Sequence, residues 1–280
     1  MDVQLDAGLR RQLAEEGWCV VPGVIPREKA DFALKRLWAA VERNAEDGFS
    51  CFLPAIDPNA SNVRLLNPLL ADPVFRELIE HEVAVEMARA VVGHEVIVAN
   101  CTANVARPGA QSMALHSDLA FILPEPWLHG WSVNVIWCLS DVRPDNGATL
   151  YIPGSHLWQT QADIPSDAME RLVPFSAEAG SLVVMDGRLW HTSGANITAH
   201  EDRALLFGYY SASFLRPMIN WTALFDAHPE IELSARLRRL LGLDIFANTS
   251  EAENAGQGDW RGLPVGRDRA LADLALARGA

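Results

Sequence analysis

The chain has 280 residues, of which 49% are hydrophobic, and this is sufficient to bury one large core. Its 23 basic and 36 acidic residues give a formal net charge of −13, which disfavours binding to nucleic acid or to an anionic membrane surface. No run approaches the roughly 20 apolar residues that span a bilayer, and the N-terminus lacks the apolar stretch of a signal peptide, so we expect a single-domain cytoplasmic protein.

The first 93 residues predict a helical region. Segment 26–47 starts with a proline, which a first helical turn tolerates, and then repeats apolar residues at helical spacing. Segment 72–93 has Asp72 as a candidate N-cap and Gly93 as a stop, so it predicts a second helix. The sequence between these helices is rich in turn-forming residues and predicts irregular structure.

From about residue 95 to 220 the sequence changes to short β-branched and aromatic runs separated by turns. These runs are EVIVANCTANV, WSVNVIWCLSDV, ATLYIP, GSLVVMD and ALLFGYYSAS. Helical patterns return over about 221–280, with a glycine-rich loop before a terminal helix. The four cysteines lack CxxC spacing, which favours reduced, buried thiols. This order predicts a mainly β fold with flanking helices, an antiparallel sandwich or barrel.

The run ALHSDLAF places His116 and Asp118 two positions apart. Alternate side chains of a β-strand share a face, so on a strand these two side chains would meet at one small ion. Downstream, His191 follows the buried run GSLVVMD and a turn. Two histidines and one carboxylate form the facial triad that holds non-haem iron(II) while leaving coordination positions open. The predicted metal ligands and catalytic residues are therefore His116, Asp118 and His191.

Four ordered motifs, LHSD, DVRPDNGATLYIPGSH, DGRLWHTSGAN and EDRALLFGYYSASF, extend this pattern. Over most of its length the chain resembles iron(II)- and 2-oxoglutarate-dependent dioxygenases of the phytanoyl-CoA dioxygenase type. The resemblance implies a double-stranded β-helix core, also called a jelly-roll or cupin-like core. It assigns Arg203, twelve residues after His191, to the distal carboxylate of 2-oxoglutarate, which a planar guanidinium matches. It also places Thr149, Ser193 and Trp137 in the co-substrate pocket.

Structural roles for these residues stay open at this point. Thr149 or Ser193 could satisfy local backbone groups at a strand end, and Trp137 could be an ordinary core residue. Arg203 could be a surface arginine at the edge of a strand. His156 follows a turn on a different predicted strand, so we interpret it as structural rather than as a fourth metal ligand.

Aromatic residues and prolines in FILPEPWLHGWS and SFLRPMINW suggest two walls of a pocket mouth, although large aromatics near a barrel rim are often plain packing. The occupant that fits best is a hydrophobic small molecule such as a terpenoid, polyketide, steroid-like or acyl compound. The acidic composition disfavours coenzyme A thioesters by repelling their phosphates. The candidate substrate-contacting residues are Phe121, Trp127, Trp131, Phe214, Met218 and Trp221.

The resemblance implies oxidation, most simply hydroxylation, of an unactivated C–H bond with iron(II), 2-oxoglutarate and O2, giving succinate and CO2 as co-products. Two alternatives stay open: a jelly-roll protein that binds metal without turnover, and a zinc-dependent hydrolase using the same three ligands. Binding alone needs no Arg203, whereas a hydrolase needs a general base near the open metal position. The terminal helices could dock on the barrel or on a second copy, so a homo-oligomer also stays open.

Overall fold

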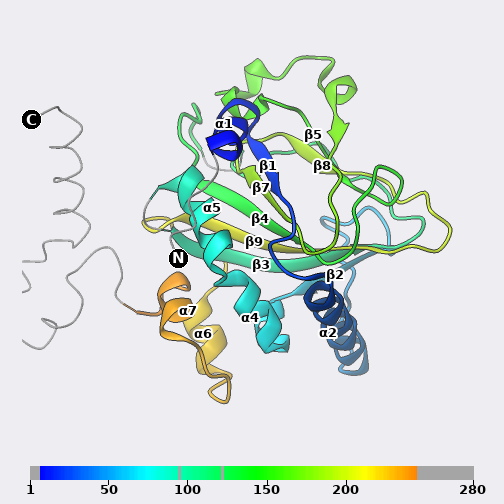
Figure 1. Cartoon of the computed structure of the whole chain (residues 1–280), viewed down its shortest axis with the longest axis vertical. Helices are drawn as coiled ribbons and strands as arrows, with labels where there is room; N and C mark the ends of the chain where they lie inside the picture. The colour runs from blue at the N-terminus through cyan, green and yellow to red at the C-terminus, as the bar shows by residue number, and fades with distance from the viewer. Residues whose placement is uncertain (1–6, 94–95, 121–122, 245–280) are drawn as a thin grey trace, which may run out of the picture.

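The computed structural model describes residues 7–93, 96–120 and 123–244, and its strands form two antiparallel sheets (Figure 1). The larger sheet contains β1 (Trp18–Val21), β2 (Asn62–Leu66), β3 (Val96–Ala106), β4 (Ser132–Cys138), β7 (Leu182–Asp186) and β9 (Arg203–Ala212). The smaller sheet contains β5 (Thr149–Tyr151), β6 (Val173–Pro174) and β8 (His191–Ser193). This is the mainly β, jelly-roll architecture that the sequence predicts.

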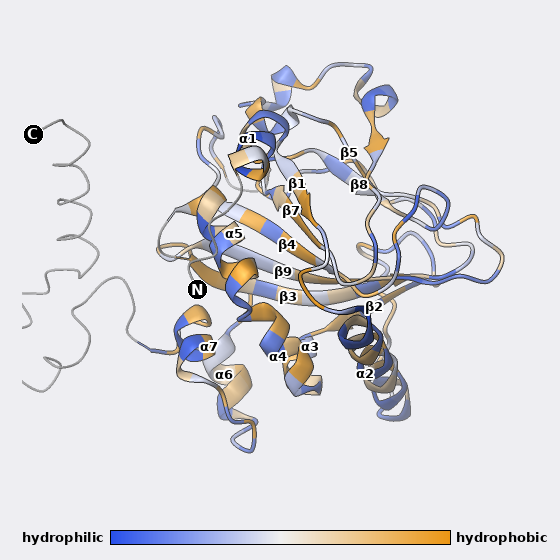
Figure 2. Ribbon diagram, in the orientation of Figure 1, coloured by the Kyte–Doolittle hydropathy of each residue, from blue (hydrophilic) through white to orange (hydrophobic). Residues whose placement is uncertain are grey.

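The larger sheet runs in the order β1-β7-β4-β9-β3-β2, and the smaller one in the order β6-β5-β8. Successive side chains of a strand point to opposite faces, so each strand of the larger sheet serves both of its faces. Figure 2 shows hydrophobic and hydrophilic residues along β3 and β4. Asn100 and Thr102 of β3 line a cavity on one face, whereas Cys101 and Ala103 belong to the core on the other.

Helices cover the second face of the larger sheet (Figure 1). The helices are α1 (Ala7–Glu16), α2 (Arg27–Glu46), α3 (Pro68–Ala71), α4 (Pro73–Ile79), α5 (Glu82–Val92), α6 (Trp221–Asp226) and α7 (Ala235–Leu240). Leu37 of α2, Phe75 of α4 and Met87 of α5 are buried in one cluster with strand residues. Full burial of one such side chain contributes about 1.5–3 kcal/mol, so this layer supplies much of the folding free energy.

Segment 72–93 forms two helices rather than the single predicted one. The predicted cap is present, because the Asp72 side chain accepts a hydrogen bond from the Val74 N–H at 3.0 Å. The chain leaves the helical conformation at His81, with φ −57° and ψ 135°. There Nδ1 of His81 accepts a hydrogen bond from the Val83 N–H at 3.3 Å. This second cap restarts the helix as α5, whereas the segment predicted over 26–47 is one continuous helix, α2.

Two strands lie in the region predicted to be helical or irregular. β1 pairs with β7 and β2 pairs with β3, so they form the two edges of the larger sheet. They have only 4 and 5 residues, and their partner strands are distant in sequence. The residue pattern within each segment is therefore too short to predict a strand. The jelly roll therefore begins before residue 95. The predicted C-terminal helix lies outside the described residues.

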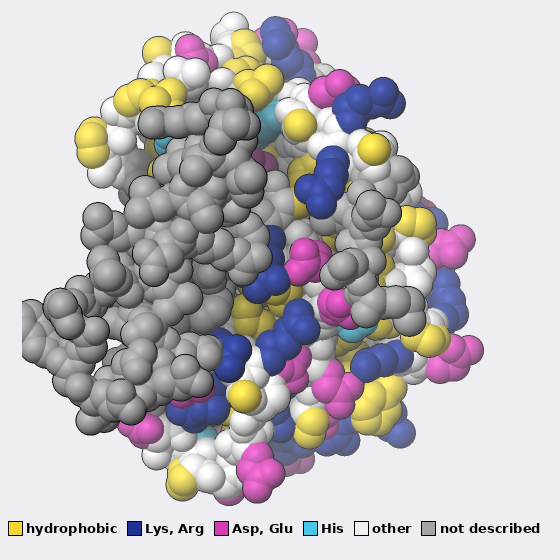
Figure 3. Space-filling model, turned by 60° about the vertical axis from the view of Figure 1, so that its left-hand side comes forward, with side chains coloured by type: hydrophobic (Ala, Val, Ile, Leu, Met, Phe, Trp, Pro, Cys, Tyr) yellow, Lys and Arg dark blue, Asp and Glu magenta, His cyan; other side chains and the backbone are white. Residues whose placement is uncertain are grey.

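On the face in Figure 3, basic and acidic side chains are interspersed. The ion pairs of the described residues include that of Lys29 and Glu77, at 2.9 Å. Within the described residues, no helix has the length and apolar character needed to cross a bilayer. The cysteines are free thiols, and burial raises the pKa of Cys19 and Cys138 to about 12, which keeps these thiols protonated.

Candidate metal and co-substrate site

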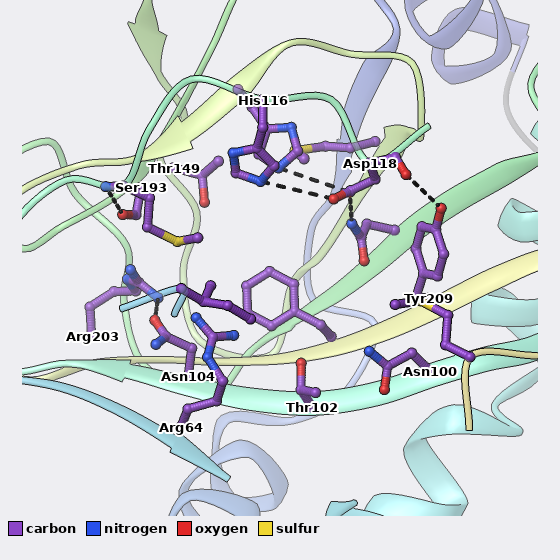
Figure 4. A pocket seen from close by; sticks show the side chains of 17 residues that line it. Arg64, Asn100, Thr102, Asn104, His116, Asp118, Thr149, Ser193, Arg203 and Tyr209 are labelled. Carbon is purple, nitrogen blue, oxygen red and sulfur yellow. Dashed lines mark hydrogen bonds and ion pairs between the residues drawn. The ribbon is translucent and has the colours of Figure 1, made fainter. Parts of the chain in front are cut away.

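The three predicted metal ligands meet at the wall of the cavity (Figure 4). Nε2 of His116 and Nε2 of His191 each lie 3.9 Å from a carboxylate oxygen of Asp118. The ligand atoms of all three residues lie within 4.8 Å of one another, and the two imidazole centroids are 4.3 Å apart. This spacing allows one ion to bind all three side chains from one side and keep open positions toward the cavity.

His116 and Asp118 are not on a regular strand, in contrast to the prediction. His116 forms an isolated antiparallel bridge with His191, the first residue of β8. The His116 N–H donates to the His191 carbonyl at 3.0 Å, and the His191 N–H donates back at 2.8 Å. Asp118 lies in the turn that follows. The two histidines are therefore joined by backbone hydrogen bonds, whereas the carboxylate is presented from a loop.

The backbone also fixes which nitrogen of each imidazole can bind a metal. Nδ1 of His116 is 2.8 Å from the Ala114 carbonyl, and Nδ1 of His191 is 2.9 Å from the Leu189 carbonyl. Because a carbonyl only accepts, each Nδ1 carries the proton and each Nε2 keeps its lone pair for the metal. Burial lowers the pKa of His191, although the Asp118 carboxylate opposes this shift. The donor set thus fits a divalent transition metal.

Two residues of the larger sheet hold the Asp118 loop in place. Asn134 of β4 donates a hydrogen bond from its amide to Oδ2 of Asp118. The Tyr209 hydroxyl, from neighbouring β9, lies 3.3 Å from the Asp118 carbonyl oxygen and 2.7 Å from Oγ of Ser132. The sequence analysis missed both residues. The available signal was an asparagine at position 134 within the otherwise apolar run VNVIW.

Arg203, the first residue of β9, is a buried cation with 1% of its surface exposed. Its Nε donates to the Gly147 carbonyl at 2.8 Å, and Nη1 donates to Oδ1 of Asn104 at 3.2 Å. No acidic side chain of the described residues pairs with it, and burial lowers its pKa to about 10, which leaves it charged at neutral pH. The structure therefore excludes the surface-arginine alternative. A buried cation without an acid partner fits an anionic ligand.

The other predicted co-substrate residues divide into two groups. Thr149 of β5 pairs with Ser193 of β8, and both line the cavity. Oγ of Ser193 accepts a hydrogen bond from the Met113 N–H at 3.0 Å. Trp137 does not line the cavity, because it points to the helix-covered face and donates from its indole to the Leu78 carbonyl at 3.1 Å. Placing Trp137 in the co-substrate pocket was therefore wrong, and its core alternative was correct.

The cavity that contains these groups has a volume of about 320 Å³. A second arginine, Arg64 of β2, lines it, but this guanidinium is paired with the buried carboxylate of Asp57 at 2.6 Å. The polar residues of β3 on this wall are Asn100, Thr102 and Asn104. The apolar residues of the lining are Ile56, Met113, Met185, Phe207 and Met218. The cavity is therefore apolar in part, with its unpaired positive charge at Arg203.

Most of the aromatic residues predicted to contact substrate lie elsewhere. Trp221 is buried in the helix layer and donates from its indole to the Val98 carbonyl at 2.7 Å. Trp127 belongs to a separate apolar cluster. Trp131 and Phe214 pack edge to face with centroids 5.0 Å apart, and neither lines the cavity. Trp127 and Trp221 bury their surface against protein, whereas Phe214 is exposed outside the cavity. Of the predicted set Met218 lines the cavity, and Phe121 lies outside the described residues.

His156 is separate from the triad. It is 3% exposed, and its Nε2 lies 3.0 Å from the Ala14 carbonyl, next to α1. Its burial lowers its pKa. This environment agrees with the structural interpretation of the PGSH motif.

Comparisons with known proteins identify the family and the fold of this chain. The family described as phytanoyl-CoA dioxygenase (PhyH) matches residues 13–204. The dioxygenase af480 of Aspergillus fumigatus is 48% identical over 231 residues, which cover 82% of this chain and 75% of that protein. The carbocyclase SnoK of nogalamycin biosynthesis has the same fold, with a TM-score of 0.63, 22% identity, and coverage of 84% of this chain and 95% of that chain.

A second solved structure is HygX from Streptomyces hygroscopicus with nickel, 2-oxoglutarate and hygromycin B bound. Its TM-score is 0.61 at 18% identity, covering 76% of this chain and 90% of that chain. Fold and site thus define a non-haem iron(II)- and 2-oxoglutarate-dependent dioxygenase. Within that class, the chain belongs to the phytanoyl-CoA dioxygenase family.

Proposed function

We propose that this dioxygenase hydroxylates an unactivated C–H bond of an apolar small molecule. In this proposal His116, Asp118 and His191 hold iron(II), and Arg203 anchors the distal carboxylate of 2-oxoglutarate. One observation carries the proposal: the three-ligand cluster and a buried cation without an acid partner line the same cavity. An anionic chelator that reaches from the cation to the metal would satisfy both.

The protein's own residues have defined tasks in this scheme. The two Nε2 atoms and one Asp118 oxygen bind the metal, and Asn134 fixes the carboxylate. Bound iron(II), 2-oxoglutarate and O2 supply the oxidation chemistry, with succinate and CO2 as co-products. Arg203 supplies the donors for the distal carboxylate, and the hydroxyl of Thr149 lies on the same wall as that of Ser193. The surrounding apolar side chains exclude water from the reacting C–H bond.

The lining supports a small uncharged substrate over a coenzyme A thioester. Ile56, Met113 and Phe207 contribute apolar surface to the cavity. Arg64 is neutralised by Asp57, and Arg203 is assigned to the co-substrate, so no further cation of the described lining is available for phosphates. The cavity volume of about 320 Å³ also suits a compact molecule.

The same lining argues against the zinc hydrolase alternative. A hydrolase needs a general base beside the metal-bound water. Asp118 is the only carboxylate among the described lining residues, and it belongs to the metal cluster. The pKa of the Tyr209 hydroxyl is raised by burial, so it cannot serve as a base at neutral pH. Oxidation therefore accounts for the site better than hydrolysis.

A turnover assay tests the proposal. Metal-free protein is supplied in air with 2-oxoglutarate and either Fe(II) or Zn(II), and succinate is measured alone and with a panel of apolar molecules. We expect succinate only with Fe(II), stimulation by members of the panel, and one labelled oxygen in the product under 18O2. Turnover with an unlabelled, desaturated or cyclised product would refute hydroxylation. Absence of succinate with Fe(II) would refute the dioxygenase assignment of these residues.

A further inference from the structure

The polar groups on the cavity wall differ in whether the protein itself uses them. Asn134 is bonded to Asp118, Asn104 to Arg203, and the Tyr209 hydroxyl to Ser132. By contrast, the side chains of Asn100 and Thr102 have no hydrogen-bonding partner within the described part of the chain. Both side chains are half-buried, and both line the cavity. Half-buried polar groups that face a cavity without partners are available to a ligand.

Their position on the sheet separates them from the co-substrate end. Asn104 accepts a hydrogen bond from Arg203. It lies two residues after Thr102 and four residues after Asn100 on β3. At about 3.3 Å per residue these intervals are about 7 and 13 Å. Asn100 is opposite Tyr209, which contacts the Asp118 loop, so it lies at the metal end of the wall (Figure 4). A five-carbon chelator held between Arg203 and the metal would leave this part of the wall free.

Apolar side chains border these two residues. Thr102 is opposite Phe207 in the sheet, and both line the cavity. The Met218 N–H donates to the Ala99 carbonyl at 2.9 Å, which holds Met218 beside Asn100. A carboxamide can both donate and accept, and a hydroxyl can do the same, so the pair suits an oxygen function of either kind. The cations of the described lining are both assigned, as argued above, so a charged group has no partner here.

From this juxtaposition we propose that Asn100 and Thr102 are substrate-recognition residues. They hydrogen-bond an uncharged oxygen function, a hydroxyl or a carbonyl, of a substrate that is otherwise apolar. The substrate class is therefore a neutral, oxygen-bearing apolar molecule rather than a plain hydrocarbon or an anion. This inference rests on the proposed function, because it assigns the co-substrate to the Arg203 end of the cavity.

The test uses rigid probes with one bicyclic skeleton: bornane has no oxygen, borneol and camphor have one, and ketopinate carries a carboxylate in addition to a ketone. Each is added without oxygen to protein loaded with Fe(II) and 2-oxoglutarate, and binding is read from the change in the visible absorption of that complex. We expect borneol or camphor to bind about tenfold more tightly than bornane and ketopinate. Asn100→Leu and Thr102→Val should each reduce that preference to about threefold or less, with 2-oxoglutarate affinity changed by less than about twofold.

The exposed Thr222 of α6 provides a matched control, because Thr222→Val makes the same chemical change outside the cavity and should leave the preference intact. Equal binding of all probes, or no binding of any, would overturn the recognition proposal while an intact Fe(II) and 2-oxoglutarate spectrum upholds the function. A large loss of 2-oxoglutarate affinity in Asn100→Leu or Thr102→Val would also overturn it, by assigning these residues to the co-substrate. Failure of the wild-type protein to form the spectrum would refute the proposed function itself.

Discussion

On β3, Cys101 packs among buried apolar residues under the helices, whereas its neighbour Asn100 lines the cavity. On β4, Trp137 donates to α4 on the helix side, whereas Asn134 donates to Asp118 on the cavity side. The two faces of the larger sheet are thus built from the same strands with different chemistry. The helix-covered face holds apolar side chains that stabilise the fold. The cavity face combines a second apolar cluster, which includes Ile136 and Leu205, with polar groups that are costly to bury. Stability and chemistry are expected to respond to different substitutions.

The largest expected effect is at the metal cluster, on the wall of the cavity opposite the helix layer. His116→Ala removes one metal ligand, so Fe(II) binding should weaken and succinate formation should fall. Loss of a residue that only orients a ligand costs about 10–100-fold, and we expect the loss of the ligand itself to cost more. The free energy of unfolding of the metal-free protein should change by less than about 1 kcal/mol, because the His116 side chain is 36% exposed. Denaturant unfolding and a succinate assay measure the two quantities. Turnover at the parental rate would contradict the triad.

The converse change is on the helix side. Trp137→Ala empties a fully buried site and should lower the free energy of unfolding by about 3–5 kcal/mol. Trp137→Phe removes the bond to the Leu78 carbonyl and should cost about 1 kcal/mol. In both variants 2-oxoglutarate affinity should be unchanged below the unfolding transition. A selective loss of that affinity in folded Trp137→Phe would show that the faces are coupled.

A smaller effect, on Fe(II) affinity, should distinguish two asparagines of the cavity face. Asn100 and Asn134 are each opposite Tyr209, on its two neighbouring strands, but only Asn134 is bonded to Asp118. Asn134→Leu should weaken Fe(II) binding by about 10–100-fold, as loss of a partner that orients a ligand does. The matched variant Asn100→Leu should leave Fe(II) affinity within about twofold. Calorimetric or competition titration with Fe(II) gives both values, and equal effects would assign no positioning role to Asn134.

The smallest effect concerns acid stability away from both faces. Burial lowers the pKa of His156 below its ordinary value of 6.5. The unfolded chain therefore binds a proton first as the pH falls, so stability is full above about pH 6.5 and is lost below it. His156→Phe should flatten this part of the curve of unfolding free energy against pH. An unchanged slope would show that other groups, such as His191, determine the acid response.

The sequence predicts the jelly-roll class and selects three residues, His116, Asp118 and His191, that lie together in the structure, because motif order and spacing carry that information. His116 and Asp118 meet although the strand assumed for them is absent, because backbone bonds to β8 and the contact with Asn134 replace it. Trp137 was misplaced because every residue of β4 is buried, so composition does not tell its faces apart. By contrast, the alternation of Asn100, Cys101 and Thr102 on β3 was a readable signal of a polar inner face.

Arg203 combines both questions, stability and chemistry. It is a buried charge in the cavity, and no acidic side chain of the described residues pairs with it. Arg203→Gln removes the charge but keeps polar atoms near Gly147 and Asn104. Relieving an unpaired buried cation should leave the metal-free protein at least as stable as the parent. The same variant should lose most of its affinity for the co-substrate.

The most direct measurement is an anaerobic titration of metal-free parent and Arg203→Gln proteins with Fe(II), then with 2-oxoglutarate, followed by visible absorption. The account predicts that both proteins bind Fe(II), that the parent develops the charge-transfer band of a chelated keto acid, and that Arg203→Gln needs about a hundredfold more 2-oxoglutarate to reach it. Equal 2-oxoglutarate affinity in the two proteins, or a parent that binds Fe(II) without developing the band, would contradict the account.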